Sequence, residues 1–309
     1  MKFLAYIISY SFVWLLHLLP ERILYLLSDI LYLLMYHVAG YRKKVVLKNL
    51  EKAFPEYNKF EIKRIAKLFF QHLCDLMLES AVSHFYSESK ALKKITYKNP
   101  ELLNELYGKG KQVMAVLGHY GNWEYMSSLA LVIDYPVVAI YKPLHNKYFD
   151  RMVQKNRNTF GVITVPMEKI ARRLIEYNKN NTPVLTLNLG DQRPMYIQIQ
   201  YWTKFMGQDT PMFLGTEKLA RKLDAAVVFL KIRKIKRGRY EMEAELICES
   251  PKGLKPYEIT KRHVAILEDL IREEPAYWLW SHKRWKHSYE KYKEEHEQQG
   301  TQPGSAANI

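Results

Sequence analysis

The chain has 309 residues, of which 48% are hydrophobic and 13% aromatic, and this composition excludes an intrinsically disordered protein. Its formal net charge of +15 favours an anionic partner such as nucleic acid, anionic lipid or an acidic protein. The two cysteines, Cys74 and Cys248, lie far apart in apolar surroundings. We therefore expect free thiols in a reducing compartment rather than a disulfide framework or a zinc site.

The chain begins with two apolar stretches. The first, 3–19, contains no Asp, Glu, Lys or Arg and has about the minimum length, roughly 17 residues, of a membrane-spanning helix. The second, 23–38, carries one acid, Asp29, and is amphipathic enough to lie in a membrane interface or pack on the protein. We expect an uncleaved membrane anchor over residues 1–40, with a cleaved signal peptide or a buried helical hairpin as alternatives. The basic run 42–44 predicts that the rest of the chain lies on the cytoplasmic side.

The next part of the chain predicts one long helix and then an α/β domain. Residues 56–85 show apolar side chains at helical spacing, and His72 lies beside that apolar stripe, where a structural role is more frequent than a catalytic one. Strand-like and helix-like segments then alternate, which is typical of a mostly parallel sheet flanked by helices. We place this domain at 41–292, with a solvated hairpin tip at 231–239 and a disordered polar tail over 293–309. The expected strands are 113–117, 137–141, 162–165, 184–189, 225–232 and 240–247, and the expected helices are 122–132, 146–159, 168–178, 212–223 and 257–273.

The stretch VMAVLGHYGNWEYMSSLAL contains the candidate active site. Its apolar segment 113–117 indicates a buried strand, which ends at Gly118 before a helix-like segment near Asn122. Such a strand-to-helix turn has free backbone N–H groups and is a common place for ligands. We expect His119 in the turn and Glu124 in the first turns of the helix, from which the carboxylate can reach back to the imidazole. His119 would then act as a general base, and Glu124 would fix its tautomer.

No convincing nucleophile accompanies this pair. Ser127 and Ser128 lie inside the expected helix, and neither cysteine is near in sequence. The arrangement therefore favours direct attack by a substrate hydroxyl over a covalent enzyme intermediate. Metal binding is the competing interpretation of a His/Glu pair, but no HExxH or CxxC occurs, and we expect no metal.

A second polar group follows the apolar strand 184–189. Asp191, Gln192 and Arg193 form the DQR of LNLGDQRP. Because parallel sheets place their sites at the carboxyl ends of strands, we expect these residues to enter the same crevice as His119. An ordinary polar loop is the alternative.

Aromatic and basic side chains alternate in YWLWSHKRWKH, residues 277–287. Stacked bases beside phosphate contacts would explain this pattern in a nucleic-acid-binding protein. Aromatic and basic residues at a lipid headgroup layer would explain it equally well. The apolar N-terminal region favours the membrane, and we expect no nucleic-acid partner.

Taken together, these residues resemble the lysophospholipid acyltransferase superfamily, and within it the bacterial lipid A biosynthesis (lauroyl/myristoyl) acyltransferases. The resemblance spans roughly Tyr41 to Lys286. GHYGNWE matches the family's signature of a His followed five positions later by Asp or Glu, although Gly118 stands where many members have Asn or Ser. The other matching pieces, in chain order, are YRKKVVLKNLEKAFPE, YKPLHNKYFDRMVQKNRNTFG, DQRP, FMG and PAYWLWSHKRWK.

The resemblance implies a glycerol-3-phosphate acyltransferase-like α/β fold and an enzyme of the bacterial inner membrane with its catalytic domain on the cytoplasmic side. It implies transfer of a fatty acyl chain from an acyl carrier protein thioester, or from acyl-CoA, to a hydroxyl of a lipid A precursor, with no other cofactor. A thioester is already activated, which fits the missing nucleophile. By this resemblance His119 is the base and Glu124 its partner. The residues expected to bind substrate or shape the site are Arg157, Asp191, Gln192 and Arg284.

Two other functions stay open. One keeps the chemistry and changes the acceptor to an aminolipid or another lysolipid. The other comes from a different class: a basic, membrane-associated protein that binds anionic lipid or nucleic acid without catalysis.

Overall fold

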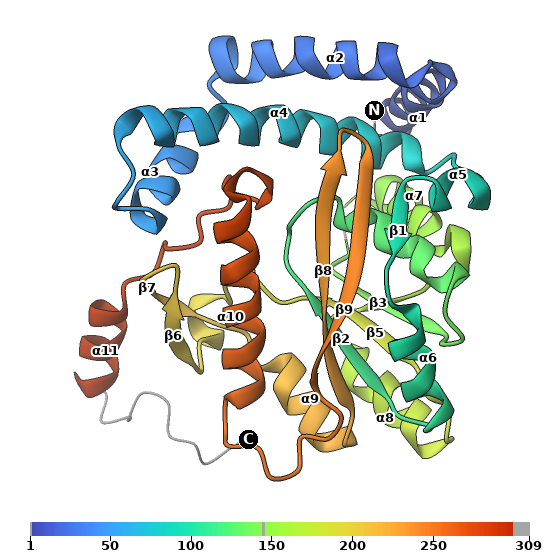
Figure 1. Ribbon diagram of the computed structural model, residues 1–309, viewed down its shortest axis with the longest axis vertical. Helices are drawn as coiled ribbons and strands as arrows, with labels where there is room; N and C mark the ends of the chain where they lie inside the picture. The colour runs from blue at the N-terminus through green and yellow to red at the C-terminus, as the bar shows by residue number, and fades with distance from the viewer. Residues whose placement is uncertain (1, 144–145, 299–309) are drawn as a thin grey trace.

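The computed structural model describes residues 2–143 and 146–298, and it places a layer of N-terminal helices across one end of an α/β domain (Figure 1). The main sheet has seven strands in the order β1-β9-β8-β2-β5-β3-β4. β8 and β9 form an antiparallel hairpin, and every other neighbouring pair is parallel. The expected α/β fold with a mostly parallel sheet is thus confirmed. The strands are β1 (Ile95–Tyr97), β2 (Val113–Leu117), β3 (Val137–Tyr141), β4 (Ile163–Pro166), β5 (Leu185–Leu189), β8 (Ala226–Lys236) and β9 (Arg239–Cys248).

The central strand β2 shows that the sheet is covered on both faces. All five residues of VMAVL are buried, as expected for a parallel strand with helices on either side. Because side chains alternate along a strand, Met114 and Val116 join one hydrophobic core, and Val113, Ala115 and Leu117 join the other. The helices and 3₁₀ helices of this domain are α5 (Glu88–Leu92), α6 (Pro100–Gly108), η2 (Trp123–Leu131), α7 (Lys147–Arg157), η3 (Asn158–Phe160), α8 (Ile170–Lys179), η4 (Tyr196–Gln198), α9 (Gly215–Leu223), α10 (Glu258–Glu273), η5 (Pro275–Tyr277) and α11 (Tyr289–Gln298).

The N-terminal layer contains α1 (Lys2–Leu18), α2 (Glu21–Leu33) with a π-helical end, η1 (Leu34–Ala39), α3 (Lys43–Ala53) and α4 (Lys59–Ser83). α4 begins at a capping box, in which Asn58 and Glu61 each bond to the other's backbone N–H. This long helix lies between α2 and the sheet domain (Figure 1). The helix predicted within 56–85 therefore forms and connects the N-terminal layer with the α/β domain.

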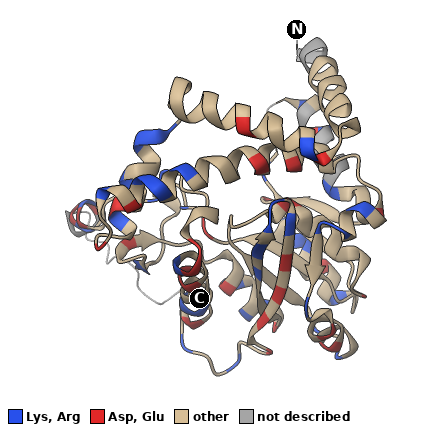
Figure 2. Ribbon diagram, turned by 45° about the horizontal axis from the view of Figure 1, so that its top comes forward, with Lys and Arg blue, Asp and Glu red and all other residues tan. Residues whose placement is uncertain are grey.

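Few charged residues lie on the described parts of α1 and α2 (Figure 2). By length and composition, one helical stretch in the described part of the chain, Glu21–Ala39, could cross a membrane; a buried core helix or a signal sequence also meets this test. Over Tyr6–Leu18, α1 is a shorter apolar helix. The most exposed large apolar side chains of the two helices are Ile8, Phe12, Leu15, Leu18, Leu26 and Leu33.

Several local predictions were wrong. The hairpin tip 231–239 is exposed only at residues 235–237, and Arg237 there pairs with Asp29 of α2 and with Asp75 of α4. The segment predicted as helix 122–132 is the 3₁₀ helix η2. Residues 293–298 continue α11 instead of starting a disordered tail, and 299–309 lie outside the described residues. Two further strands, β6 (Trp202–Phe205) and β7 (Gln208–Pro211), form a hairpin that is not among the predicted strands.

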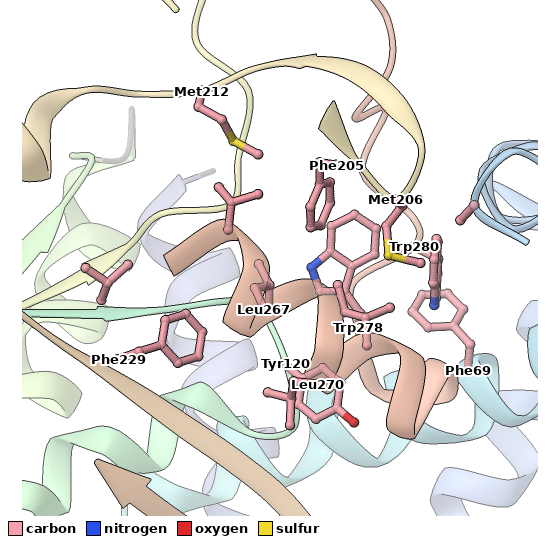
Figure 3. Packing of buried hydrophobic residues seen from close by; sticks show 14 of the residues in the cluster. Phe69, Tyr120, Phe205, Met206, Met212, Phe229, Leu267, Leu270, Trp278 and Trp280 are labelled. Carbon is pink, nitrogen blue, oxygen red and sulfur yellow. The ribbon is translucent and has the colours of Figure 1, made fainter. Parts of the chain in front are cut away.

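The aromatic and basic segment 277–287 is largely part of the core instead of a headgroup layer. Trp278 and Trp280 are buried and pack edge to face with ring centroids 4.7 Å apart. Figure 3 shows Trp278 beside Phe205, whose ring centroid lies 5.5 Å from that of Trp278. This packing fixes the backbone of 277–279 next to the turn that follows β2, where it forms an isolated bridge between Trp278 and Tyr120.

Candidate active site

His119 and Asp191 meet because two neighbouring strands end at the same level. Leu117, the last residue of β2, pairs with Leu189, the last residue of β5. His119 and Asp191 each follow two positions later, after a glycine in both cases. The expected convergence of the two polar groups at the carboxyl edge of the sheet is confirmed.

Asp191 holds His119 at two points. Its Oδ1 lies 2.6 Å from His119 Nδ1, and its Oδ2 accepts the backbone N–H of His119 at 2.9 Å. The same Oδ2 accepts the indole N–H of Trp278 at 2.8 Å. Both side chains of the pair are buried. Trp278 is a site residue that the sequence pattern did not identify, because its position beside Asp191 depends on contacts across the chain.

The electrostatics of Asp191 decide which nitrogen of His119 carries the hydrogen. Burial alone would raise the pKa of Asp191, but His119 and the hydrogen bonds from its side chain, its backbone and Trp278 outweigh burial and lower that pKa to about 2. The ionised carboxylate can only accept, so Nδ1 of a neutral His119 carries the hydrogen. The lone pair then lies on Nε2, which is 3.0 Å from Nε2 of Gln192.

The backbone of the turn is clamped by the segment 277–279. Leu279 N–H donates to the His119 carbonyl, and Gly121 N–H donates to the Tyr277 carbonyl, both at 3.0 Å. Gly121 has a φ of +61°, a conformation that favours glycine, and a Cβ there would lie 3.0 Å from Ile232. The chain reversal between His119 and η2 thus depends on this glycine.

Glu124 does not hold His119. Both ring nitrogens of His119 bond to other residues, and Glu124 Oε1 instead accepts from Arg157 Nη2 at 3.1 Å. Trp123 contacts both Glu124 and His119. Its indole N–H donates to the Glu124 carboxylate at 3.2 Å, and its ring packs edge to face on the His119 imidazole with centroids 4.9 Å apart. The predicted Glu124–His119 hydrogen bond is therefore wrong, because Trp123 and the turn of η2 direct the carboxylate toward α7. The sequence pattern identified Glu124 and the family resemblance identified Arg157, but neither indicated that the two side chains form an ion pair.

A family model described as bacterial lipid A biosynthesis acyltransferase matches residues 2–287. The chain belongs to this family. It is therefore an acyltransferase with a lipid A-type acceptor, and the predicted family and enzyme class are confirmed. The comparison with curated proteins gives no match.

Two cavities of the acyltransferase meet at the Glu124–Arg157 pair. A groove of about 510 Å³ runs between α1, α4 and β3, and its lining is mainly apolar. A smaller cavity of about 60 Å³ lies beneath η2, and Glu124 and Arg157 line both spaces. The apolar residues that line the smaller cavity are Leu117, Trp123, Met126, Ala139, Ile140, Val162, Leu187 and Leu189.

The last predicted site residue, Arg284, does not reach the surface of the site. Its side chain is fully buried, donates to the Pro211 carbonyl at 3.0 Å and lies 2.8 Å from the Met212 sulfur. Burial lowers its pKa to about 9. Of the two roles expected for Arg284, this burial fits shaping the site, because the β6–β7 hairpin and the segment after it cover the guanidinium.

Other polar groups complete the surroundings of the acyltransferase site. Arg193, next to Gln192, donates to the Lys283 carbonyl at 3.1 Å and lies 2.7 Å from His287 Nε2. Within residues 2–143 and 146–298, no group of three or more His, Cys, Asp or Glu side chains is arranged to hold a metal ion.

Proposed function

We propose that this acyltransferase moves a fatty acyl chain from an acyl carrier protein thioester to a hydroxyl of a lipid A precursor, with His119 as general base. The observation that carries the proposal is the His119–Asp191 pair at the carboxyl edge of the sheet. A neutral imidazole whose Nδ1–H is held by an ionised carboxylate can accept a proton at Nε2. Asp191 therefore takes the orienting role that the sequence pattern suggested for Glu124.

The reaction forms one carbon–oxygen bond and breaks one carbon–sulfur bond. The acceptor hydroxyl displaces the Gln192 amide from Nε2 of His119, gives its proton to that nitrogen and attacks the thioester carbonyl carbon. The carbonyl oxygen becomes an oxyanion, to which the released Gln192 N–H can donate. When the intermediate collapses, the carbon–sulfur bond breaks and the proton passes from His119 to the leaving thiolate. Asp191 stabilises the imidazolium between the two steps.

The apolar cavities support an acyl substrate. Lipid chains bind in spaces lined by apolar side chains, with a few polar groups that fix their orientation. Here the Glu124–Arg157 pair is the polar group common to the groove and the smaller cavity. We assign Arg157 to holding polar atoms of the substrate where its acyl chain enters, and Glu124 to holding Arg157 in place. Asp191 and Gln192 act at His119.

The exposed apolar side chains of α1 and α2 support binding at the inner membrane, and the basic run 42–44 that follows supports a catalytic domain on the cytoplasmic side. The large groove is lined by Tyr10 and Val13 of α1, so acyl chains can enter it next to these apolar side chains. The formal charge of +15 suits both an anionic membrane surface and an acidic carrier protein.

A reconstituted assay tests the proposal. Purified enzyme is incubated with an acyl carrier protein thioester and a lipid A precursor, and the products are measured by mass spectrometry. His119→Ala should reduce the rate by roughly two to four orders of magnitude, whereas His37→Ala, at an exposed histidine of η1, should not. Transfer retained by His119→Ala would overturn the mechanism. If the unmutated enzyme transfers the acyl chain only to an aminolipid or lysolipid, the proposed acceptor is wrong. If it transfers to no lipid, the non-catalytic binding function is favoured.

A further inference from the structure

Glu79 of α4 is a fully buried carboxylate that contacts the active-site turn at Asn122. Its Oε2 accepts from Asn122 Nδ2 at 2.9 Å and from the Tyr240 hydroxyl at 2.8 Å. Its Oε1 accepts from the Tyr25 hydroxyl at 3.0 Å. One side chain therefore joins α2, the β8–β9 hairpin and the turn between β2 and η2.

Asn122 lies between His119 and Glu124 and is itself fully buried. Its Oδ1 has no hydrogen-bond partner among the described residues, so the contact with Glu79 is what holds this side chain. The next residue begins η2, and the carbonyl of Asn122 accepts the N–H of Tyr125 at 3.2 Å. The orientation of Asn122 thus sets where η2 begins relative to His119.

The chemistry of Glu79 determines which atom of the Asn122 amide faces it. Burial, followed by Glu79 itself, raises the pKa of Tyr240 well above its usual value, so the phenol stays protonated and donates. A carboxylate surrounded by three donors can only accept, and therefore it selects the amide nitrogen of Asn122 over the oxygen. Buried charge is costly unless hydrogen bonds compensate it, and an apolar side chain would pack at this place at lower cost.

We propose that Glu79 is a positioning residue for the acyl transfer: it fixes Asn122 and thereby the spacing between His119 and the Glu124–Arg157 pair. This inference rests on the proposed function of His119 as base. His72 of the same helix contacts Gly121, the residue before Asn122: its Nε2 lies 3.2 Å from the Gly121 carbonyl oxygen. α4 therefore holds the turn through two of its residues, at the backbone of Gly121 and at the side chain of Asn122.

An exchange of amide and carboxylate across the contact tests the proposal. In Asn122→Asp two carboxylates face each other at the distance of the present hydrogen bond, so the turn should shift and kcat should fall about 10- to 100-fold with little change in KM. The kcat of Glu79→Gln alone should stay within about threefold of the wild-type value. The glutamine oxygen can accept from Asn122 while the glutamine amide donates to the Tyr25 oxygen. In the double variant Glu79→Gln, Asn122→Asp the new amide donates to the new carboxylate, and kcat should recover to within about threefold of wild type.

Tyr25→Phe is the matched control. It removes a donor of Glu79 but leaves the Asn122 contact, so it should lower the melting temperature and keep kcat. If Asn122→Asp does not fold, Asn122→Ala replaces it, with the same expected loss of kcat. Wild-type kcat in the folded Asn122 variants, or no recovery in the double variant, would overturn the inference. Failure of the proposed function would be recognised by a different result, namely that His119→Ala retains acyl transfer.

Discussion

Asp191 and His119 are 72 positions apart in sequence, yet Asp191 binds both the ring and the backbone N–H of His119. The two bonds fix the rotation of the imidazole as well as its tautomer. The carboxylate that lies five positions from the histidine in the GHYGNWE motif, Glu124, belongs instead to an ion pair with Arg157. The site therefore contains two carboxylates with different tasks.

Asp191→Asn should reduce kcat by about two to four orders of magnitude. The asparagine amide can present its N–H to Nδ1, which would move the imidazole hydrogen to Nε2 and remove the base. Steady-state kinetics with a thioester donor measure the effect, and circular dichroism checks the fold. A rate within tenfold of wild type would show that Asp191 does not orient His119.

Glu124→Gln should weaken the hold on Arg157 and reduce kcat/KM by about tenfold, a loss of roughly 1.4 kcal/mol. The dependence of the rate on pH should stay that of the unmutated enzyme, because both ring nitrogens of His119 bond to residues other than Glu124. The pH–rate profiles of the two enzymes provide the comparison. A changed profile in Glu124→Gln would restore the mechanism in which Glu124 orients the base.

Ala139→Phe should shift the preference of the enzyme to shorter acyl donors. The larger ring would fill the cavity beneath η2, which Ala139 lines. Competition between donors of different chain length should show a change of about tenfold or more in the ratio of kcat/KM values. Ala171→Phe, at an exposed position of α8, is the control and should leave the ratio unchanged. An unchanged ratio in Ala139→Phe would mean that acyl chains bind elsewhere.

Acid should destabilise the protein below about pH 6.5 through its buried histidines. Burial lowers the pKa of His72 to about 3, with Lys234 adding to the effect, and burial lowers the pKa of His263 to about 4. Since the unfolded chain binds these protons first, the stabilisation is present above pH 6.5, the ordinary histidine pKa, and is lost as pH falls toward the folded values. Melting temperatures from pH 7 to 4 should fall more steeply for wild type than for His263→Asn. Equal slopes would exclude a contribution from His263.

The double variant Phe12→Glu, Leu15→Glu should bind vesicles of anionic lipid more than tenfold more weakly, because each side chain loses the roughly 1.5–3 kcal/mol gained by burying a large apolar group. Leu246→Glu is the control, at an exposed apolar residue of β9 outside the N-terminal layer. Cosedimentation with vesicles measures both. Equal binding of the double variant and the control would place the membrane contact away from α1.

Much of the fold could be predicted because its signals are local. The bounds of β2 and β3 agree with the predicted segments, since buried runs of β-branched and aliphatic residues end at clear turn residues. The β6–β7 hairpin was missed because its residues, such as Gln208 and Asp209, have little strand preference and pair only through the tertiary packing. The prediction of a solvated hairpin tip fails in part because Lys234, Arg237 and Arg239 pair with carboxylates of α2 and α4, which are distant in sequence.

The sequence by itself determined the family, the mostly parallel α/β class and the two polar groups that follow apolar strands, because motif spacing and hydrophobic period are properties of neighbouring residues. Tertiary structure alone decided which groups act together. The β2–β5 register sets His119 beside Asp191, α7 sets Arg157 beside Glu124, and α4 sets Glu79 against Asn122. These pairings depend on strand order and helix packing, which bring together residues that no local pattern connects.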